Sequence, residues 1–260
     1  MLYLNIDDHK ITALVSDTTE TSAPVLLERS VMTDHYDEVL EEIAQACRDN
    51  HGVPAKMEVF VCGPITIAPT AEMITAPDVL FSHCFDFTDK TQRKVCCDEI
   101  IDLYALLIFG VNSYVEESLF RHFPDTEIAF HSSLTPLLTV FSRSYEVQYR
   151  LRTYLHCREG FIDIFAFDGR SLTIMNSFPV CSVNDAVYYT IALSKSIGID
   201  IYTMPFYVCG DKEMADALRQ GMQQFAATVQ DVDLLETLPS AYTLVKHQLP
   251  HSIAAHLSCA

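Results

Sequence analysis

The most restrictive feature of this 260-residue sequence is an order of predicted elements that occurs twice. Residues 2–63 predict three strands, a helix and a fourth strand followed by glycine, and residues 151–210 predict the same order. The two segments share this pattern without evident sequence identity. A repeated order of strands and helices predicts an α/β protein with two similar subdomains, each built on a mixed sheet with flanking helices.

Short turn and cap signals mark the elements of the second copy. The segments Arg158-Glu159-Gly160 and Asp168-Gly169-Arg170 each place glycine where a hairpin needs a positive φ. Ser182, with Asp185 three residues later, predicts the start of a helix. Gly198 predicts its end, because glycine is favoured just after the last helical turn.

The first copy opens with a tight hairpin at Asp7-Asp8-His9-Lys10, and its helix is expected to begin at Asp34 or His35. The segment after its fourth strand contains several prolines together with phenylalanines, so we expect an irregular insertion that is packed down. A later helix is expected to carry the chain into the second copy. The expected boundaries are 1–131 for the first subdomain with an insertion near 64–94, 132–146 for the crossover helix, and 147–260 for the second subdomain.

The composition restricts the partners and the compartment. A net charge of −18 at pH 7 opposes binding to nucleic acid or to an anionic membrane surface. No apolar run approaches the roughly 20 residues of a membrane span, so direct membrane insertion is not expected. The nine cysteines are irregularly spaced and include no Cys-x-x-Cys pair, which favours free thiols in the reducing cytoplasm over disulfides or a metal site.

Two such halves around a cleft make the actin-like ATPase architecture, in which each half is ribonuclease H-like. The sequence resembles a family of Bacteroides-type bacterial proteins of unknown function that have this fold. The resemblance spans nearly the whole chain and rests on His131-Ser132-Ser133, Asn176-Ser177-Phe178, the helix with Asp185, Tyr188 and Tyr189, Cys209-Gly210-Asp211 and the terminal Leu257-Ser258-Cys259-Ala260. It implies wider relatives among bacterial cell-division, pilus-assembly and secretion-platform proteins, some of which bind ATP and some of which do not.

An ATP site in such a fold needs glycine-rich hairpins, because backbone N–H groups must approach phosphate oxygens closely. The first hairpin has two carboxylates and a lysine but no glycine, and the second has Glu159 where the fold implies aspartate. A glycine pair is expected near the nucleoside, yet only Gly210 is present. The candidate cleft residues are Asp7, Asp8, Lys10, Glu159, Gly160, Gly210 and Asp211.

Three functions are compatible with these patterns. The sequence favours a non-catalytic, cytoplasmic, actin-like scaffold that binds a protein partner and needs no cofactor, with no catalytic or metal-binding residues. The alternative is a nucleotide-binding actin-like ATPase that uses ATP with Mg²⁺ at degraded phosphate loops. A weaker alternative is a metal-dependent nuclease of the ribonuclease H type, in which Asp7, Asp163 and Asp168 form the carboxylate cluster.

Overall fold

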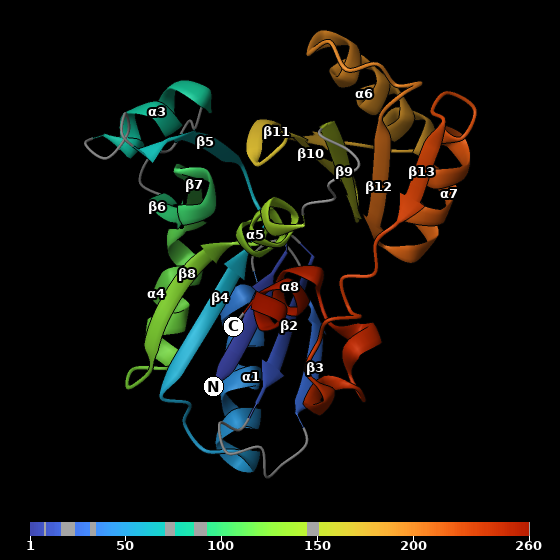
Figure 1. The fold of residues 1–260 in the computed structure, drawn as a ribbon. Coiled ribbons are helices and arrows are strands. Elements are labelled where there is room, and N and C mark those ends of the chain that lie inside the picture. The colour runs from blue at the N-terminus through green and yellow to red at the C-terminus, as the bar shows by residue number, and fades with distance from the viewer. Residues whose placement is uncertain are drawn as a thin grey trace. The chain divides into compact units, whose positions relative to one another are not determined.

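The computed structural model describes residues 1–7, 9–16, 24–31, 35–70, 76–85, 93–144 and 151–259. The chain forms two compact units: unit 1 comprises Met1–Leu137 with Thr237–Ala260, and unit 2 comprises Leu138–Glu236 (Figure 1). The C-terminal segment, which the sequence analysis placed in the second subdomain, packs with unit 1. Unit 2 is therefore inserted between two parts of unit 1 along the chain.

Unit 1 is built on a five-stranded sheet with the order β3-β2-β1-β4-β8. The first three strands pair antiparallel through hairpins, whereas β1, β4 and β8 run parallel. Both connection types follow from the chain order, since a helix or an insertion separates each parallel pair. The strands are β1 (Leu2–Ile6), β2 (Lys10–Val15), β3 (Val25–Ser30), β4 (Lys56–Val61) and β8 (Glu127–Ser132).

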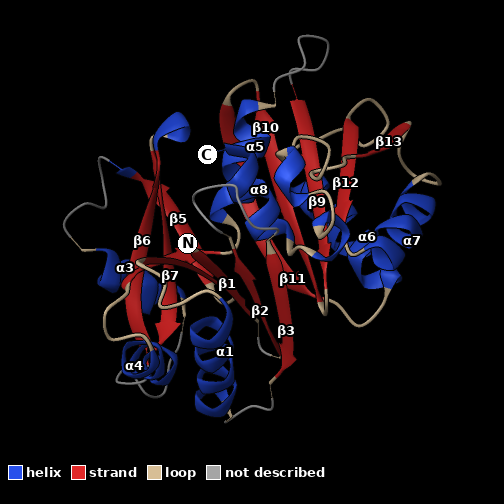
Figure 2. Ribbon diagram, turned by 90° about the horizontal axis from the view of Figure 1, so that it is seen from below, coloured by secondary structure: helices blue, strands red, loops and turns tan. Residues whose placement is uncertain are grey.

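Helices cover both faces of this sheet, as the two ribbon views show (Figures 1 and 2). Alternate residues of β1 point to opposite faces. Leu4 joins the core formed with α1 (Tyr36–Asn50) and α4 (Ser113–His122), which pack against each other. On the other face, Asn5 accepts a hydrogen bond at 2.7 Å from Ser252 of α8 (His251–Cys259). Burial of the apolar side chains of α8 explains why the C-terminus packs with unit 1.

The insertion is more regular than expected from the sequence. It contributes β5 (Ile65–Pro69) and β6 (Arg93–Ile100), which flank β7 (Ala105–Asn112) in an antiparallel three-stranded sheet. A short helix, α3 (Pro77–Cys84), packs on this sheet through buried Phe81. The 3-10 turn η2 spans Ile101–Leu103.

Unit 2 repeats the strand order of unit 1, as β11-β10-β9-β12-β13. The duplicated organisation predicted from the sequence is thus present. Helix α5 links the two units, and α6 and α7 lie together on one face of the unit 2 sheet (Figure 2). The elements are α5 (Thr135–Arg143), β9 (Leu151–Arg158), β10 (Phe161–Asp168), β11 (Ser171–Pro179), α6 (Val183–Ser196), β12 (Pro205–Gly210), α7 (Lys212–Met222) and β13 (Thr228–Asp231).

The local turn and cap signals in unit 2 are confirmed. Gly160, Gly169 and Gly198 have φ values of 70°, 61° and 72°. Ser182 accepts the Asp185 N–H and caps α6. Asp34, one of the two residues expected to open the first helix, lies outside the described residues, and His35 precedes α1.

Two further 3-10 turns, η3 (Ser240–Tyr242) and η4 (Lys246–Gln248), lead into α8. None of the helices in the described ranges is both long and apolar enough to cross a membrane. All nine cysteines are described, and each is a free thiol.

Candidate functional site

The hairpin expected to face a phosphate joins β1 and β2 in unit 1. The Asp7 backbone N–H donates to the Lys10 carbonyl at 2.9 Å and closes the hairpin. The Lys10 ammonium lies 3.1 Å from a carboxylate oxygen of Glu28 on β3. Asp8, the remaining candidate of this hairpin, lies outside the described residues. The Asp7 N–H and the Lys10 cation are thus both engaged within unit 1.

The other four candidates come from two neighbouring strand ends in unit 2. Glu159 and Gly160 form the exposed turn after β9, and Gly210 and Asp211 end the parallel strand β12. Because β9 and β12 pair directly and run parallel, these two segments lie side by side at the carboxyl-terminal ends of the two strands. The structure therefore brings four candidates together in unit 2, while Asp7 and Lys10 belong to unit 1.

Gly210 has a local structural role at these strand ends. Its φ is 118°, a conformation that side chains rarely adopt, and a Cβ atom there would lie 2.0 Å from the Cys157 carbonyl oxygen. The Asp211 N–H donates to that same oxygen at 2.7 Å. The Asp211 carboxylate accepts the Met214 N–H at 3.0 Å, so Asp211 caps α7. The glycine makes room for the chain's own backbone.

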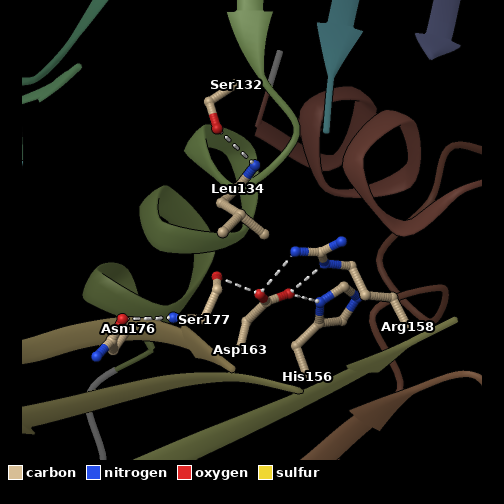
Figure 3. Close-up of polar contacts among 7 residues, drawn as sticks. All are labelled: Ser132, Leu134, His156, Arg158, Asp163, Asn176 and Ser177. Carbon is tan, nitrogen blue, oxygen red and sulfur yellow. Dashed lines mark hydrogen bonds and ion pairs between the residues drawn. The ribbon is translucent and has the colours of Figure 1, made fainter. Parts of the chain in front are cut away.

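A buried polar cluster lies next to these strand ends and is centred on Asp163 of β10 (Figure 3). His156 Nδ1 donates to one carboxylate oxygen at 2.9 Å, and Arg158 donates to both oxygens at 3.0 and 3.3 Å. The Ser177 hydroxyl of β11 adds a fourth hydrogen bond at 2.5 Å. Three neighbouring strands therefore contribute to this Asp163 cluster.

The electrostatics of the cluster keep Asp163 ionised. Burial acts to raise its pKa, but the His156 hydrogen bond and the Arg158 guanidinium outweigh burial and lower the pKa to about 2. The guanidinium also lies over the Phe161 ring, 4.2 Å from its centroid. Since the charges of Arg158 and Asp163 are close and opposite, neither is presented as an isolated charge.

The nuclease hypothesis is wrong about Asp163 and Asp168. Asp163 is fully buried, with both oxygens hydrogen-bonded to protein groups, and so cannot take a metal ion without losing those bonds. Asp168 is five residues further along β10, which places it on the opposite face and about 16 Å away. Within the described residues, no group of three or more His, Cys, Asp or Glu side chains is placed to hold a metal ion.

A second polar cluster lies in unit 1, centred on His131 of β8. Its Nε2 lies 2.7 Å from Glu58 of β4 and its Nδ1 lies 2.9 Å from Asp98 of β6. Asp98 also accepts the Ser132 N–H at 2.9 Å and the Thr135 hydroxyl at 2.5 Å. Since both ring nitrogens face carboxylates, His131 is an imidazolium, and this His131 cluster joins the three-stranded sheet to the five-stranded sheet.

The pKa values agree with this arrangement. Burial acts to lower the pKa of His131, yet the hydrogen bonds to Asp98 and Glu58 raise it to about 9. The hydrogen bond from His131 in turn lowers the pKa of Glu58. An imidazole that is already protonated and doubly bonded cannot serve as a general base at neutral pH.

We expect the stability of unit 1 to decrease from about pH 6.5 to about pH 9. A raised histidine pKa stabilises the fold fully below the unfolded value of about 6.5, and this contribution is lost as pH rises through the folded value of about 9. The expected loss is on the order of 2 kcal/mol, measured as the free energy of unfolding in urea across this range. The variant His131→Gln should be less stable and should lack most of this pH dependence. An unchanged pH profile in that variant would show that His131 is not the titrating group.

The sequence patterns predict neither cluster. They bring in Asp163 only for a nuclease, and His131 only within the resemblance. A signal existed for His156, because the turn at Glu159-Gly160 places it directly opposite Asp163 in the antiparallel register. No comparable signal marks the Glu58 and Asp98 partners, which lie 73 and 33 residues from His131.

Comparison with known proteins identifies the fold. A Bacteroides thetaiotaomicron VPI-5482 protein with an actin-like ATPase fold and unknown function is 17% identical, with a TM-score of 0.77 and coverage of 100% of this chain and 95% of that chain. A chain of the PilM–PilN type IV pilus biogenesis complex is 10% identical, with a TM-score of 0.59 and coverage of 99% and 97%. No curated protein matches the sequence. The actin-like ATPase fold predicted from the sequence is therefore confirmed.

The family model described as "Protein of unknown function (DUF3822)" matches residues 2–229. This match includes both polar clusters and both five-stranded sheets up to the middle of β13, and the C-terminal segment with α8 lies outside it. Because the match covers most of the chain, this protein belongs to the DUF3822 family.

Proposed function

We propose that this protein is an actin-like scaffold that binds another protein and does not hydrolyse ATP. Its function is to bind the partner protein and not a nucleotide, so the protein needs neither ATP nor Mg²⁺ as a cofactor. A chain of similar fold belongs to a complex of pilus biogenesis, which supports protein binding as a use of this fold. The net charge of −18 supports a protein partner over nucleic acid.

The observation that carries the proposal is that groups near the expected phosphate positions are already engaged within the chain. In unit 2, the backbone of Cys157 fills the space beside Gly210. Arg158, which directly precedes Glu159, is bonded to Asp163. A phosphate cradle needs several N–H groups and cations that point into one concavity, so binding would require these contacts to break.

The first hairpin supports the same conclusion. The Asp7 N–H is used to close the turn, and Lys10 is paired with Glu28. A polyphosphate at this hairpin would compete with a carboxylate for the lysine and would meet the negative charge of Asp7. Both effects weaken binding of an anionic ligand.

We propose the cytoplasm as the compartment of this protein. Nine free thiols, three of which are buried, persist most readily where disulfides do not form. Exposed Cys84, Cys97 and Cys181 would be open to oxidation elsewhere.

We expect titration calorimetry with Mg-ATP to give no saturable heat up to millimolar nucleotide, with a dissociation constant weaker than about 1 mM. Phosphate release from ATP should not exceed that of buffer. Both measurements use the wild-type chain, with unfolding monitored separately to show that the protein is native.

Binding of Mg-ATP with a dissociation constant in the low micromolar range would overturn this proposal if the Lys10→Ala variant no longer bound the nucleotide. That result would establish nucleotide binding. Lys56→Ala is the matched control, since Lys56 forms a similar exposed ion pair with Glu127, 3.3 Å apart, at the start of β4. Loss of binding in both variants would indicate attraction by general charge, which contradicts a specific site.

A further inference from the structure

Strand β11 ends the unit 2 sheet among the described residues, with β10 on its inner side. It is nine residues long, with the sequence Ser-Leu-Thr-Ile-Met-Asn-Ser-Phe-Pro, and carries no charged side chain. The pairing with β10 shifts between Ala166 and Phe167, so the regular part of the edge is 174–179. Natural edge strands are often protected by charges, short length, proline or a β-bulge, because their backbone groups pair readily with another strand. The stretch 174–179 lies beyond the register shift, carries no charge, and has proline only at its last position.

Hydrogen bonds near the end of β11 show which way its backbone groups point. The Val180 N–H donates to the Gly160 carbonyl at 2.8 Å, toward β10. Successive residues of a strand point their N–H and carbonyl groups to alternate sides. The backbone N–H and carbonyl groups of Phe178 and Asn176 therefore point toward β10. Those of Ser177 and Met175 point away from it.

The side chain of Asn176 covers one of these outward groups. The Ser177 N–H donates to Asn176 Oδ1 at 2.9 Å, as Figure 3 shows. This bond confirms that the Ser177 N–H points away from β10. Asn176 is exposed, and rotation of its side chain would release the donor to a new partner. The Asn176 amide is thus a removable cover on the edge.

Aromatic side chains line the α6 side of the same edge. The Phe178 ring is stacked on Tyr189 of α6, with centroids 4.6 Å apart and planes at 9°. Tyr188 contacts Tyr189 edge-on at 5.4 Å and is 66% exposed. Peptides that add to a sheet gain affinity from main-chain hydrogen bonds and specificity from such side-chain contacts.

We propose that the outer edge of β11, over Ile174–Pro179, binds an extended segment of a partner protein by strand addition, and that basic residues flank this segment. The inference rests on the proposed function, for which it names the binding surface. The chain carries a net charge of −18, whereas the edge itself is neutral, so an uncharged strand with cationic ends is complementary to both. A second copy of this chain would bring the same negative charge to the interface, which opposes self-pairing.

The probe is a synthetic peptide of six alternating valine and threonine residues with two lysines at each end. We expect saturable binding to the wild-type protein, followed by fluorescence anisotropy of a labelled peptide. The same peptide with every backbone nitrogen of the six-residue core methylated has no N–H donor for the ladder and should bind at least about tenfold more weakly. A peptide flanked by glutamates should also bind about tenfold more weakly at low salt.

Variants of the edge separate backbone pairing from side-chain effects. Met175→Pro removes an outward N–H without removing a bond to β10, and should weaken the peptide at least about tenfold. Met175→Ala keeps that N–H and is the matched control, expected to stay within about threefold of wild type. Asn176→Ala exposes the Ser177 N–H and should strengthen binding several-fold. Thermal unfolding of each variant verifies that unit 2 remains folded.

Three results would overturn the proposal: no binding of the lysine-flanked peptide, equal binding of the methylated peptide, or equal loss in Met175→Pro and Met175→Ala. A wild-type dimer that becomes monomeric in Met175→Pro, measured by sedimentation, would overturn it too, because the edge would then serve self-association. Tight Mg-ATP binding alongside normal peptide binding would refute the proposed function yet leave this edge site intact, so the two failures are distinguishable.

Discussion

Replacing Gly210 by alanine is expected to lower the free energy of unfolding by at least about 4 kcal/mol, enough to prevent folding of many natural domains. The added Cβ would lie 2.0 Å from the carbonyl oxygen and 2.5 Å from the nitrogen of Cys157. Both atoms belong to the backbone of β9, which is paired to β12 and cannot move away without breaking the sheet. The φ of 118° adds strain for any residue other than glycine.

Gly160→Ala is the matched control for this substitution. Gly160 lies in the same unit and also has a positive φ, of 70°, but no atom lies within 4 Å of an added Cβ. We expect this variant to lose only about 1 kcal/mol, from backbone strain alone. Urea unfolding followed by circular dichroism measures both, and the soluble fraction on expression ranks them if Gly210→Ala does not fold. Equal stability of the two variants would contradict the close approach of β9 and β12.

Features encoded within a few residues could be predicted from the sequence. Gly160 and Gly169 adopt the positive φ that their turns require, and Ser182 caps the helix that it precedes. These signals depend on local sterics and local hydrogen bonds, which are the same whatever the rest of the chain does. The positions of these turns define the order of strands and helices, and that order predicts the duplicated fold.

Features that depend on distant segments could not be predicted in the same way. The hydrogen bond between Ser252 and Asn5 joins residues 247 positions apart, so nothing near either residue indicates that α8 packs with unit 1. The Glu58 and Asp98 partners of His131 come from β4 and β6, which belong to different sheets. The sequence pattern gives which face of a strand is buried, but the choice of partner is decided by tertiary packing.

Asp163→Ala is expected to destabilise unit 2 by about 3–5 kcal/mol, because removing one member of a buried ion pair leaves the others uncompensated. Asp163 is fully buried, and the substitution would leave Arg158 without its carboxylate partner. The depressed pKa gives a further signature. Its contribution is present above the unfolded value of about 4 and is lost as pH falls through about 2, so Asp163→Asn and wild type should converge in stability over that range. Glu159→Ala, an exposed change in the adjacent turn, should cost less than about 0.5 kcal/mol.

A double-mutant cycle with Arg158→Met distinguishes a destabilising buried charge from a simple cavity at position 163. If the cost of Asp163→Ala arises mainly from the uncompensated guanidinium, then Arg158→Met in that background should restore about 1–3 kcal/mol, since the methionine stem can still pack against Phe161. If the cost arises from lost volume and from the orphaned Ser177 hydroxyl, the two substitutions should instead be additive. Because donors from β9 and β11 converge on one carboxylate of β10, we expect the first outcome: the cluster acts as an electrostatic unit that sets the register of β9, β10 and β11, and the edge strand β11 depends on it for its position.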